Sequence, residues 1–139
     1  MAKIKITVIY KKDRRKEECL GEFELEEAAA LLESFNVLTY IPEAKEGDCV
    51  SIWFQAGPGR EITVAAFANQ EFGVLFNVQE SKKLLGMISV SKKAEWTNAW
   101  SLTRAEAVFM VRFILGADPK DLAHWVQNNL LLMRSSAQD

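Results

Sequence analysis

The first residues of the chain alternate between apolar and polar side chains. On an extended backbone, Ile4, Ile6 and Val8 share one face, and the residues between them share the other. This period of two predicts a strand over residues 3–11. The charged residues 11–18 that follow are predicted to form a solvated turn or hairpin tip.

From Phe23 the apolar period changes to three or four residues, which is typical of an amphipathic helix. The apolar face of this predicted helix carries Leu25, Ala28, Ala29, Leu32 and Phe35. Glutamates lie largely around the other side. Those in the first turn favour the positive end of the helix dipole.

Short strands separated by turn residues are predicted next. They cover residues 37–41, ending at Pro42, and residues 49–55, 61–68, 72–78 and 86–91. Residues 43–48 are polar enough to form a loop, and Gly57, Pro58 and Gly59 indicate a hairpin. Consecutive short strands with tight turns favour an antiparallel meander.

Two helices are predicted near the C-terminus. Thr103 and Glu106 have capping-box spacing, and the helix that they begin ends at Gly116. Asp118 and Pro119 are predicted to begin a second helix that ends near Trp125. The apolar positions of the first helix are Ala107, Val108, Val111, Ile114 and Leu115.

The whole chain is predicted to be one α+β domain, an antiparallel β-meander sheet with an N-terminal helix and C-terminal helices packed on it. Its 139 residues suit a single domain, which typically has roughly 100–150. The composition, with 49% hydrophobic and 26% charged residues, is that of an ordinary globular protein. Residues 133–139 are expected to be a frayed tail.

The N-terminus alternates in polarity, unlike the continuous apolar core of a secretory signal. No apolar run reaches the roughly 18–20 residues that cross a bilayer. We therefore expect a cytoplasmic monomer without membrane contact.

Catalytic groups are not recognisable. His124 is the single histidine, on a predicted helix without a nucleophile motif nearby, and we expect it to be structural. Cys19 and Cys49 lack metal-site or redox spacing, so we expect buried, reduced thiols and no metal or cofactor. The alternative for these two cysteines is a disulfide. A small hydrolase or transferase, the enzymatic alternative, requires clustered acids around His124.

Nucleic-acid and phosphate binding are not favoured either. The net charge is −2, and acids interrupt the basic run at residues 11–16. The segment from Gly57 to Arg60 lacks the Lys-Ser/Thr ending of a phosphate-binding loop, so it is interpreted as a hairpin turn.

Acidic residues concentrate between Glu17 and Asp48, where they form either a solvated surface or a docking face for a basic partner. The candidate partner-binding acids are Glu22, Glu24, Glu26, Glu27, Glu43, Glu46 and Asp48. Trp96 and Trp100 flank a polar connection, and one of them is a candidate aromatic anchor. Trp53 is expected in the core, and Trp125 is expected to hold the terminal helix on the sheet.

Three segments of the chain carry a family resemblance. They are the run Leu-Glu-Glu-Ala-Ala-Ala-Leu-Leu at residues 25–32, the Gly-rich hairpin, and the segment from Ala107 through Gly116 and Pro119 to Trp125. Together they resemble the first-numbered immunity family of bacterial polymorphic toxin systems. The resemblance implies an inhibitor in interbacterial competition, which binds a cognate secreted toxin, such as a nucleic-acid deaminase or nuclease, and occludes its active site. The alternative is a non-catalytic adaptor or regulatory module for a peptide or small ligand.

Overall fold

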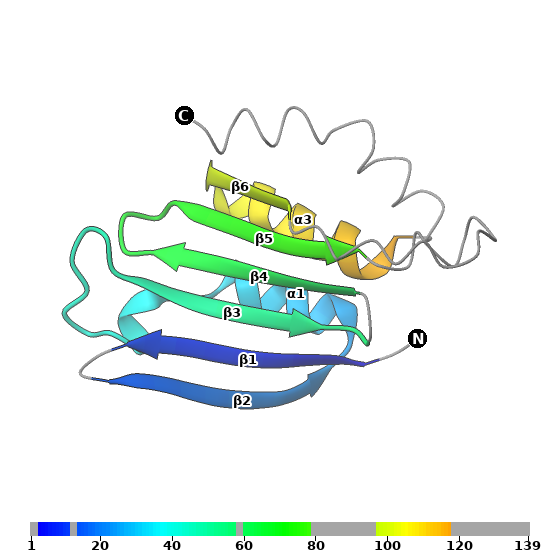
Figure 1. Ribbon diagram of the computed structural model, residues 1–139, viewed down its shortest axis with the longest axis horizontal. Helices are drawn as coiled ribbons and strands as arrows, with labels where there is room; N and C mark the ends of the chain where they lie inside the picture. Colours follow the sequence, from blue (N-terminus) through cyan, green and yellow to red (C-terminus); the bar gives the residue numbers. More distant parts are fainter. Residues whose placement is uncertain (1–2, 12–13, 58–59, 79–96, 118–139) are drawn as a thin grey trace.

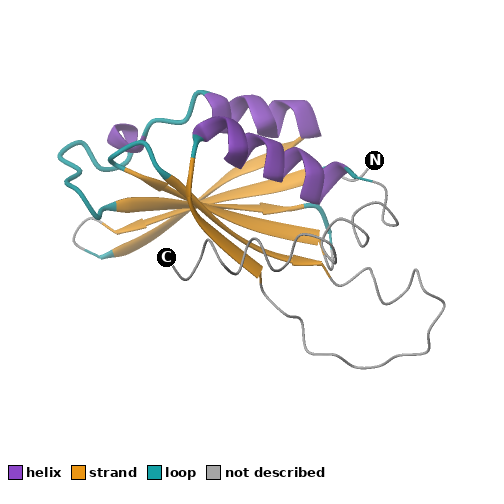
Figure 2. Cartoon of the chain, turned by 90° about the horizontal axis from the view of Figure 1, so that it is seen from above, coloured by secondary structure: helices purple, strands orange, loops and turns teal. Residues whose placement is uncertain are grey.

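A six-stranded antiparallel sheet forms the body of the protein, with the described helices α1 and α3 on one face (Figures 1 and 2). The computed structural model describes residues 3–11, 14–57, 60–78 and 97–117. The strand order is β2-β1-β3-β4-β5-β6, which confirms the predicted α+β meander. The strands are β1 (Ile4–Lys11), β2 (Arg15–Phe23), β3 (Cys49–Gln55), β4 (Arg60–Phe67), β5 (Phe72–Val78) and β6 (Thr97–Leu102).

The two helices run antiparallel over the sheet. Helix α1 (Leu25–Glu33) follows β2, and helix α3 (Arg104–Gly116) follows β6. A Cβ atom on Gly116 would collide with the side chain of Leu25, so the last turn of α3 packs closely on the first turn of α1. At the other end, Arg104 bonds the carbonyl of Leu32 in α1.

The core lies between the helices and the sheet. Alternate residues of β3, Val50, Ile52 and Phe54, are buried on the helix-covered face, and the residues between them are half-buried on the opposite face. Strand β4 repeats this alternation. Because the sheet period is two, a strand with one fully covered face shows this burial pattern.

The capping box predicted for α3 is confirmed. The backbone N–H of Glu106 donates to the Thr103 hydroxyl at 3.1 Å, and the backbone N–H of Thr103 donates to the Glu106 carboxylate at 2.9 Å. Two backbone donors at the helix start are thus satisfied by side chains. At the start of α1, the Glu27 carboxylate likewise accepts from the N–H of Glu24.

Three local predictions are wrong. Residues 15–18, predicted to belong to a solvated tip, begin strand β2, and they were misread because an edge strand with mostly exposed side chains shows no apolar alternation. Residues 37–39 form the 3₁₀-helix η1 (Val37–Thr39) and no strand. Residues 97–102, predicted as a polar connection and helix start, form the edge strand β6.

Other predictions fall outside the described residues. These are the strand at 86–91, the helix expected from Asp118 to Trp125, and the frayed tail. His124 and Trp96 also lie outside them.

Candidate binding site

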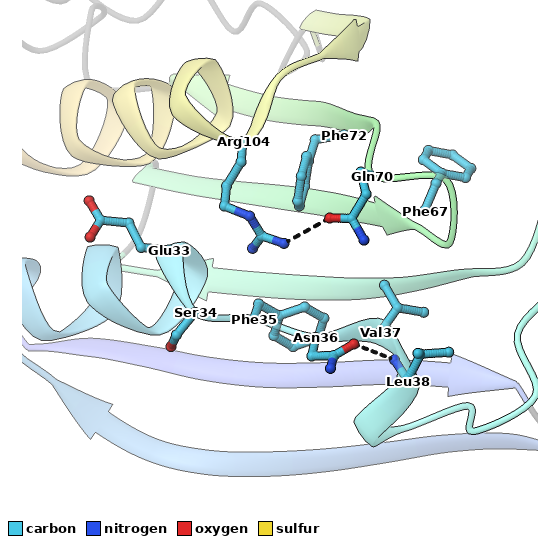
Figure 3. A pocket seen from close by; sticks show the side chains of 10 residues that line it. All are labelled: Glu33, Ser34, Phe35, Asn36, Val37, Leu38, Phe67, Gln70, Phe72 and Arg104. Atoms are coloured by element: carbon cyan, nitrogen blue, oxygen red, sulfur yellow. Dashed lines mark hydrogen bonds between the residues drawn. The ribbon is translucent and has the colours of Figure 1, made fainter.

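A pocket of about 400 Å³ opens at the end of the sheet where α1 ends and α3 begins (Figure 3). Helix η1 and the β4–β5 turn complete its wall. It combines one cation, one carboxylate, neutral polar groups and aromatic rings. The lining residues are Glu33, Ser34, Phe35, Asn36, Val37, Leu38, Phe67, Gln70, Phe72 and Arg104.

Arg104 is held in place by three contacts. Its Nη1 donates to the carbonyl oxygen of Leu32 at 2.8 Å, and its Nη2 donates to Oε1 of Gln70 at 3.3 Å. The guanidinium carbon lies 4.9 Å from the centre of the Phe72 ring, within the range of a cation–π contact. The half-buried guanidinium therefore enters the pocket in a fixed orientation.

The sequence contained one signal for this role. Arg104 is the first residue of α3, where the interaction of a positive side chain with the helix dipole is unfavourable by roughly 0.3–1 kcal/mol. A cation at this unfavourable position is expected to be stabilised by contacts outside its own helix. Arg104 makes them with Leu32 of α1 and Gln70 of the β4–β5 turn.

Two carboxamides in the pocket are oriented by bonds within the protein. Oδ1 of Asn36 accepts from the backbone N–H of Leu38 at 3.0 Å, and Oε1 of Gln70 accepts from Arg104. Because both partners are N–H donors, each amide must present its oxygen to the protein. The remaining polar atom of each side chain is therefore an NH₂ group, which only donates.

Gln70 has a strained backbone. It adopts a positive φ of 72° in the β4–β5 loop, residues 68–71, a position that glycine usually occupies. The N–H of Gln70 bonds the carbonyl of Phe67, and the N–H of Phe67 bonds the carbonyl of Glu71. The left-handed conformation costs an ordinary L-residue roughly 1–2 kcal/mol.

We expect Gln70→Gly to be more stable than Gln70→Ala by about 1 kcal/mol, which reverses the usual preference for alanine. Both variants lose the bond to Arg104, so their difference isolates the backbone strain. Urea unfolding of the two variants measures it. A more stable alanine variant would contradict the left-handed conformation.

The seven predicted acids are all exposed, but they form two groups instead of one face. Glu22, Glu24, Glu26 and Glu27 lie around the start of α1. Glu43, Glu46 and Asp48 lie in the loop between η1 and β3, at the opposite end of the molecule (Figure 1). The second group follows η1, whose residues line the pocket.

Two acids of the first group form ion pairs. Glu26 pairs with Arg112 of α3 at 3.2 Å, and Glu24 approaches Lys3 at 3.9 Å. In the loop group, the Asp48 carboxylate accepts the backbone N–H of Lys45 at 2.9 Å.

Trp100 lies on the sheet face opposite the helices. Trp100 and Ser101 together stand opposite Gly73 in a β-bulge, and the indole packs where a Gly73 side chain would be. It also meets Phe67 edge-on, with ring centres 6.3 Å apart. Trp100 is 42% exposed, yet this face is separate from the acidic groups.

Trp53 lies on the same face as Trp100 and is half-buried. The prediction that Trp53 belongs to the core is therefore wrong. The core lies on the helix-covered face, where Ile52 and Phe54 are buried, and Trp53 points to the opposite face.

Two further large apolar side chains are exposed on the helix side of the molecule. Leu38 in η1 is 50% exposed at the pocket rim, and Phe109 on the outer surface of α3 is 52% exposed. Phe109 stacks on Phe113 with ring centres 5.8 Å apart. Each acidic group thus has one exposed apolar residue associated with it. Leu38 precedes the loop acids in the chain, and Phe109 lies on α3, the helix whose Arg112 pairs with Glu26.

Both cysteines are free thiols. Cys19 is exposed on β2, so its predicted burial is wrong. Cys49 is half-buried, and burial raises the pKa of its thiol above the ordinary value, with a smaller contribution from Asp48. A raised pKa lowers the thiolate fraction and hence the reactivity of Cys49.

No three His, Cys, Asp or Glu side chains in the described ranges gather closely enough to hold a metal ion. None of the described helices has the length and apolar character needed to span a bilayer.

Fold and site together define an α+β domain with an open sheet and a pocket at one end of its helical layer. Comparisons with protein-family models, curated proteins and solved structures find no match for the chain. The resemblance to an immunity family therefore stays a prediction.

Proposed function

We propose that this protein acts by binding a protein partner, as an immunity protein that neutralises a cognate secreted toxin by occluding its active site. The proposal joins the sequence resemblance to the surface around the pocket. Toxins that act on nucleic acid have positive substrate clefts, for which an acidic surface is complementary. The proposed setting is the cytoplasm.

The observation that carries the proposal is Leu38. This half-exposed side chain stands at the rim of a pocket, and the loop that follows η1 carries Glu43, Glu46 and Asp48. Binding energy at an interface typically concentrates in a few side chains at well-packed pockets, surrounded by contacts that exclude water. The acids beside Leu38 favour a basic partner and fast association.

Leu38→Ala is expected to weaken binding of the partner about tenfold or more, because truncating an interface anchor removes its buried contact. Phe109→Ala is the matched control, since Phe109 is equally exposed but lies on the outer surface of α3. The toxin encoded beside this gene is co-expressed and co-purified, and its affinity is then measured for each variant.

The affinities of the Leu38→Ala and Phe109→Ala variants show which of the two acidic groups lies at the interface. Loss of binding with Phe109→Ala alone moves the interface to the helical layer and to the acids around the start of α1. Failure of the native protein both to form a complex and to rescue cells from the toxin overturns the proposal.

A second candidate function, a module that binds a peptide or small ligand, is favoured by the pocket itself. Pockets with apolar walls and a few convergent polar groups are typical ligand sites. The two functions require different partners but use neighbouring surfaces.

A further inference from the structure

The polar groups of the pocket are mostly hydrogen-bond donors. Arg104 can only donate, and the free atoms of the Asn36 and Gln70 carboxamides are NH₂ groups because their oxygens are already bonded. A ligand that satisfies these groups must supply acceptor oxygens. We propose that the pocket binds a carboxylate attached to an apolar body, such as the C-terminal residue of a peptide.

The charge of the pocket favours a single negative group. A guanidinium has five N–H donors, of which Arg104 uses one on Leu32 and one on Gln70. The other N–H groups have no acceptor in the described part of the chain. Their planar arrangement suits the two oxygens of a carboxylate.

Glu33 is the one acid that lines the pocket, and it lies to the side of this site. Its carboxylate is 3.7 Å from Arg112, and Figure 3 shows it pointing away from the Arg104 guanidinium. Arg112 thus offsets the negative charge of Glu33. Arg104 is the one cation among the described lining residues, which disfavours a dianion such as phosphate.

One exposed apolar side chain borders this site. Leu38 is half-exposed at the rim, whereas Phe35 and Phe72 are buried in the wall and Phe67 packs on Trp100 on the opposite sheet face. The volume of about 400 Å³ is at the lower end of the range for ligand pockets, roughly 300–1,000 Å³. A terminal residue whose apolar side chain lies against Leu38 is therefore the class of ligand that we expect.

The Gln70 backbone supports a binding role. A glutamine is retained in a left-handed position that favours glycine, and its side chain supplies a bond that orients Arg104. Strained residues of this kind cluster at binding sites, where the surrounding structure holds them. This inference rests on the second candidate function, for which it names the ligand class, and it does not require a toxin.

The test uses the full chain labelled with ¹⁵N and followed by NMR during titration. The probes are N-acetyl-phenylalanine, its neutral amide, 3-phenylpropionate and inorganic phosphate. We expect N-acetyl-phenylalanine to shift the amides around Leu38 and Gln70, and its amide to bind at least about tenfold more weakly, because a charged hydrogen bond is lost.

The other probes distinguish the source of the carboxylate. Tighter binding of N-acetyl-phenylalanine than of 3-phenylpropionate identifies a peptide end, and equal binding identifies a free organic acid. Equal binding of the acid and its amide overturns the proposal, as does preferential binding of phosphate or an absence of shifts at the pocket.

Variants locate the binding groups. Arg104→Gln is expected to weaken N-acetyl-phenylalanine about tenfold or more, whereas Arg15→Gln, which changes an exposed arginine of β2 that does not line the pocket, leaves affinity within about twofold. Gln70→Gly provides a second variant in case Arg104→Gln does not fold, with an expected loss of about threefold. Unchanged affinity in both pocket variants overturns the assignment.

Discussion

Replacing Phe54 by alanine is expected to lower the free energy of unfolding by about 3–5 kcal/mol, which is typical for a buried phenylalanine. Phe54 is fully buried on β3 and faces the helices. Its cross-strand neighbours Ile6 on β1 and Ile62 on β4 are buried as well. The cavity left by truncation is therefore surrounded by close-packed side chains that relax only partly.

The adjacent residue in the strand is the matched control. Trp53 is half-buried on the opposite face, with Thr7 and Thr63 beside it on the neighbouring strands. Trp53→Ala should therefore cost clearly less than Phe54→Ala, although tryptophan is the larger side chain. Urea unfolding of both variants measures the difference. Equal losses would contradict a principal core on the helix-covered face.

Elements with one buried face could be predicted from the sequence. Strand β1 was predicted from its period of two, and helices α1 and α3 from their apolar stripes and end signals. In each case one face packs on the core, so burial imposes a period on the sequence. Thr103, Glu106 and Gly116 added local signals that set the bounds of α3.

Both edge strands were missed for a common physical reason. Strand β2 pairs only with β1, and most of its side chains are exposed, so its charged sequence resembles a turn. Strand β6 pairs only with β5 and contains the bulge opposite Gly73. Pairing of backbone groups, which leaves no pattern in the side chains, determines these two elements.

Helix η1 was mistaken for a strand because a short apolar run fits either structure. The Asn36 side chain bonds the N–H of Leu38 and Tyr40 bonds back to Val37, which together close the turn. Phe35 and Tyr40 then stack, with ring centres 5.4 Å apart. These contacts depend on side chains that meet only in the folded chain.

The candidate site was only partly accessible to sequence reasoning. Charge density pointed to the acids, but it could not show that they occupy two ends of the molecule. The pocket residues Asn36, Gln70 and Arg104 come from three distant segments, and each is unremarkable alone. Meander topology brings them together, because α1 and α3 meet antiparallel over the sheet.

The second large effect is expected at Arg60, which joins the start of β4 to the end of α3. Its side chain is a rare buried cation, with the residue 8% exposed. Nη1 donates to the carbonyl oxygens of Leu115 at 3.3 Å and Ala117 at 2.7 Å. These carbonyls belong to the negative end of the helix dipole, where a cation is stabilising.

Arg60→Ala should lower the free energy of unfolding by about 2–4 kcal/mol, because carbonyl groups at the helix end lose their donor and their opposite charge. Arg60→Lys keeps the charge and should recover part of the loss. Arg15→Ala, which removes an exposed arginine on β2, should change stability by less than about 1 kcal/mol. Faster hydrogen exchange in the last turn of α3, beyond the global change, would identify helix capping as the cause. A loss spread evenly over all amides would instead assign Arg60 to the general stability of the sheet.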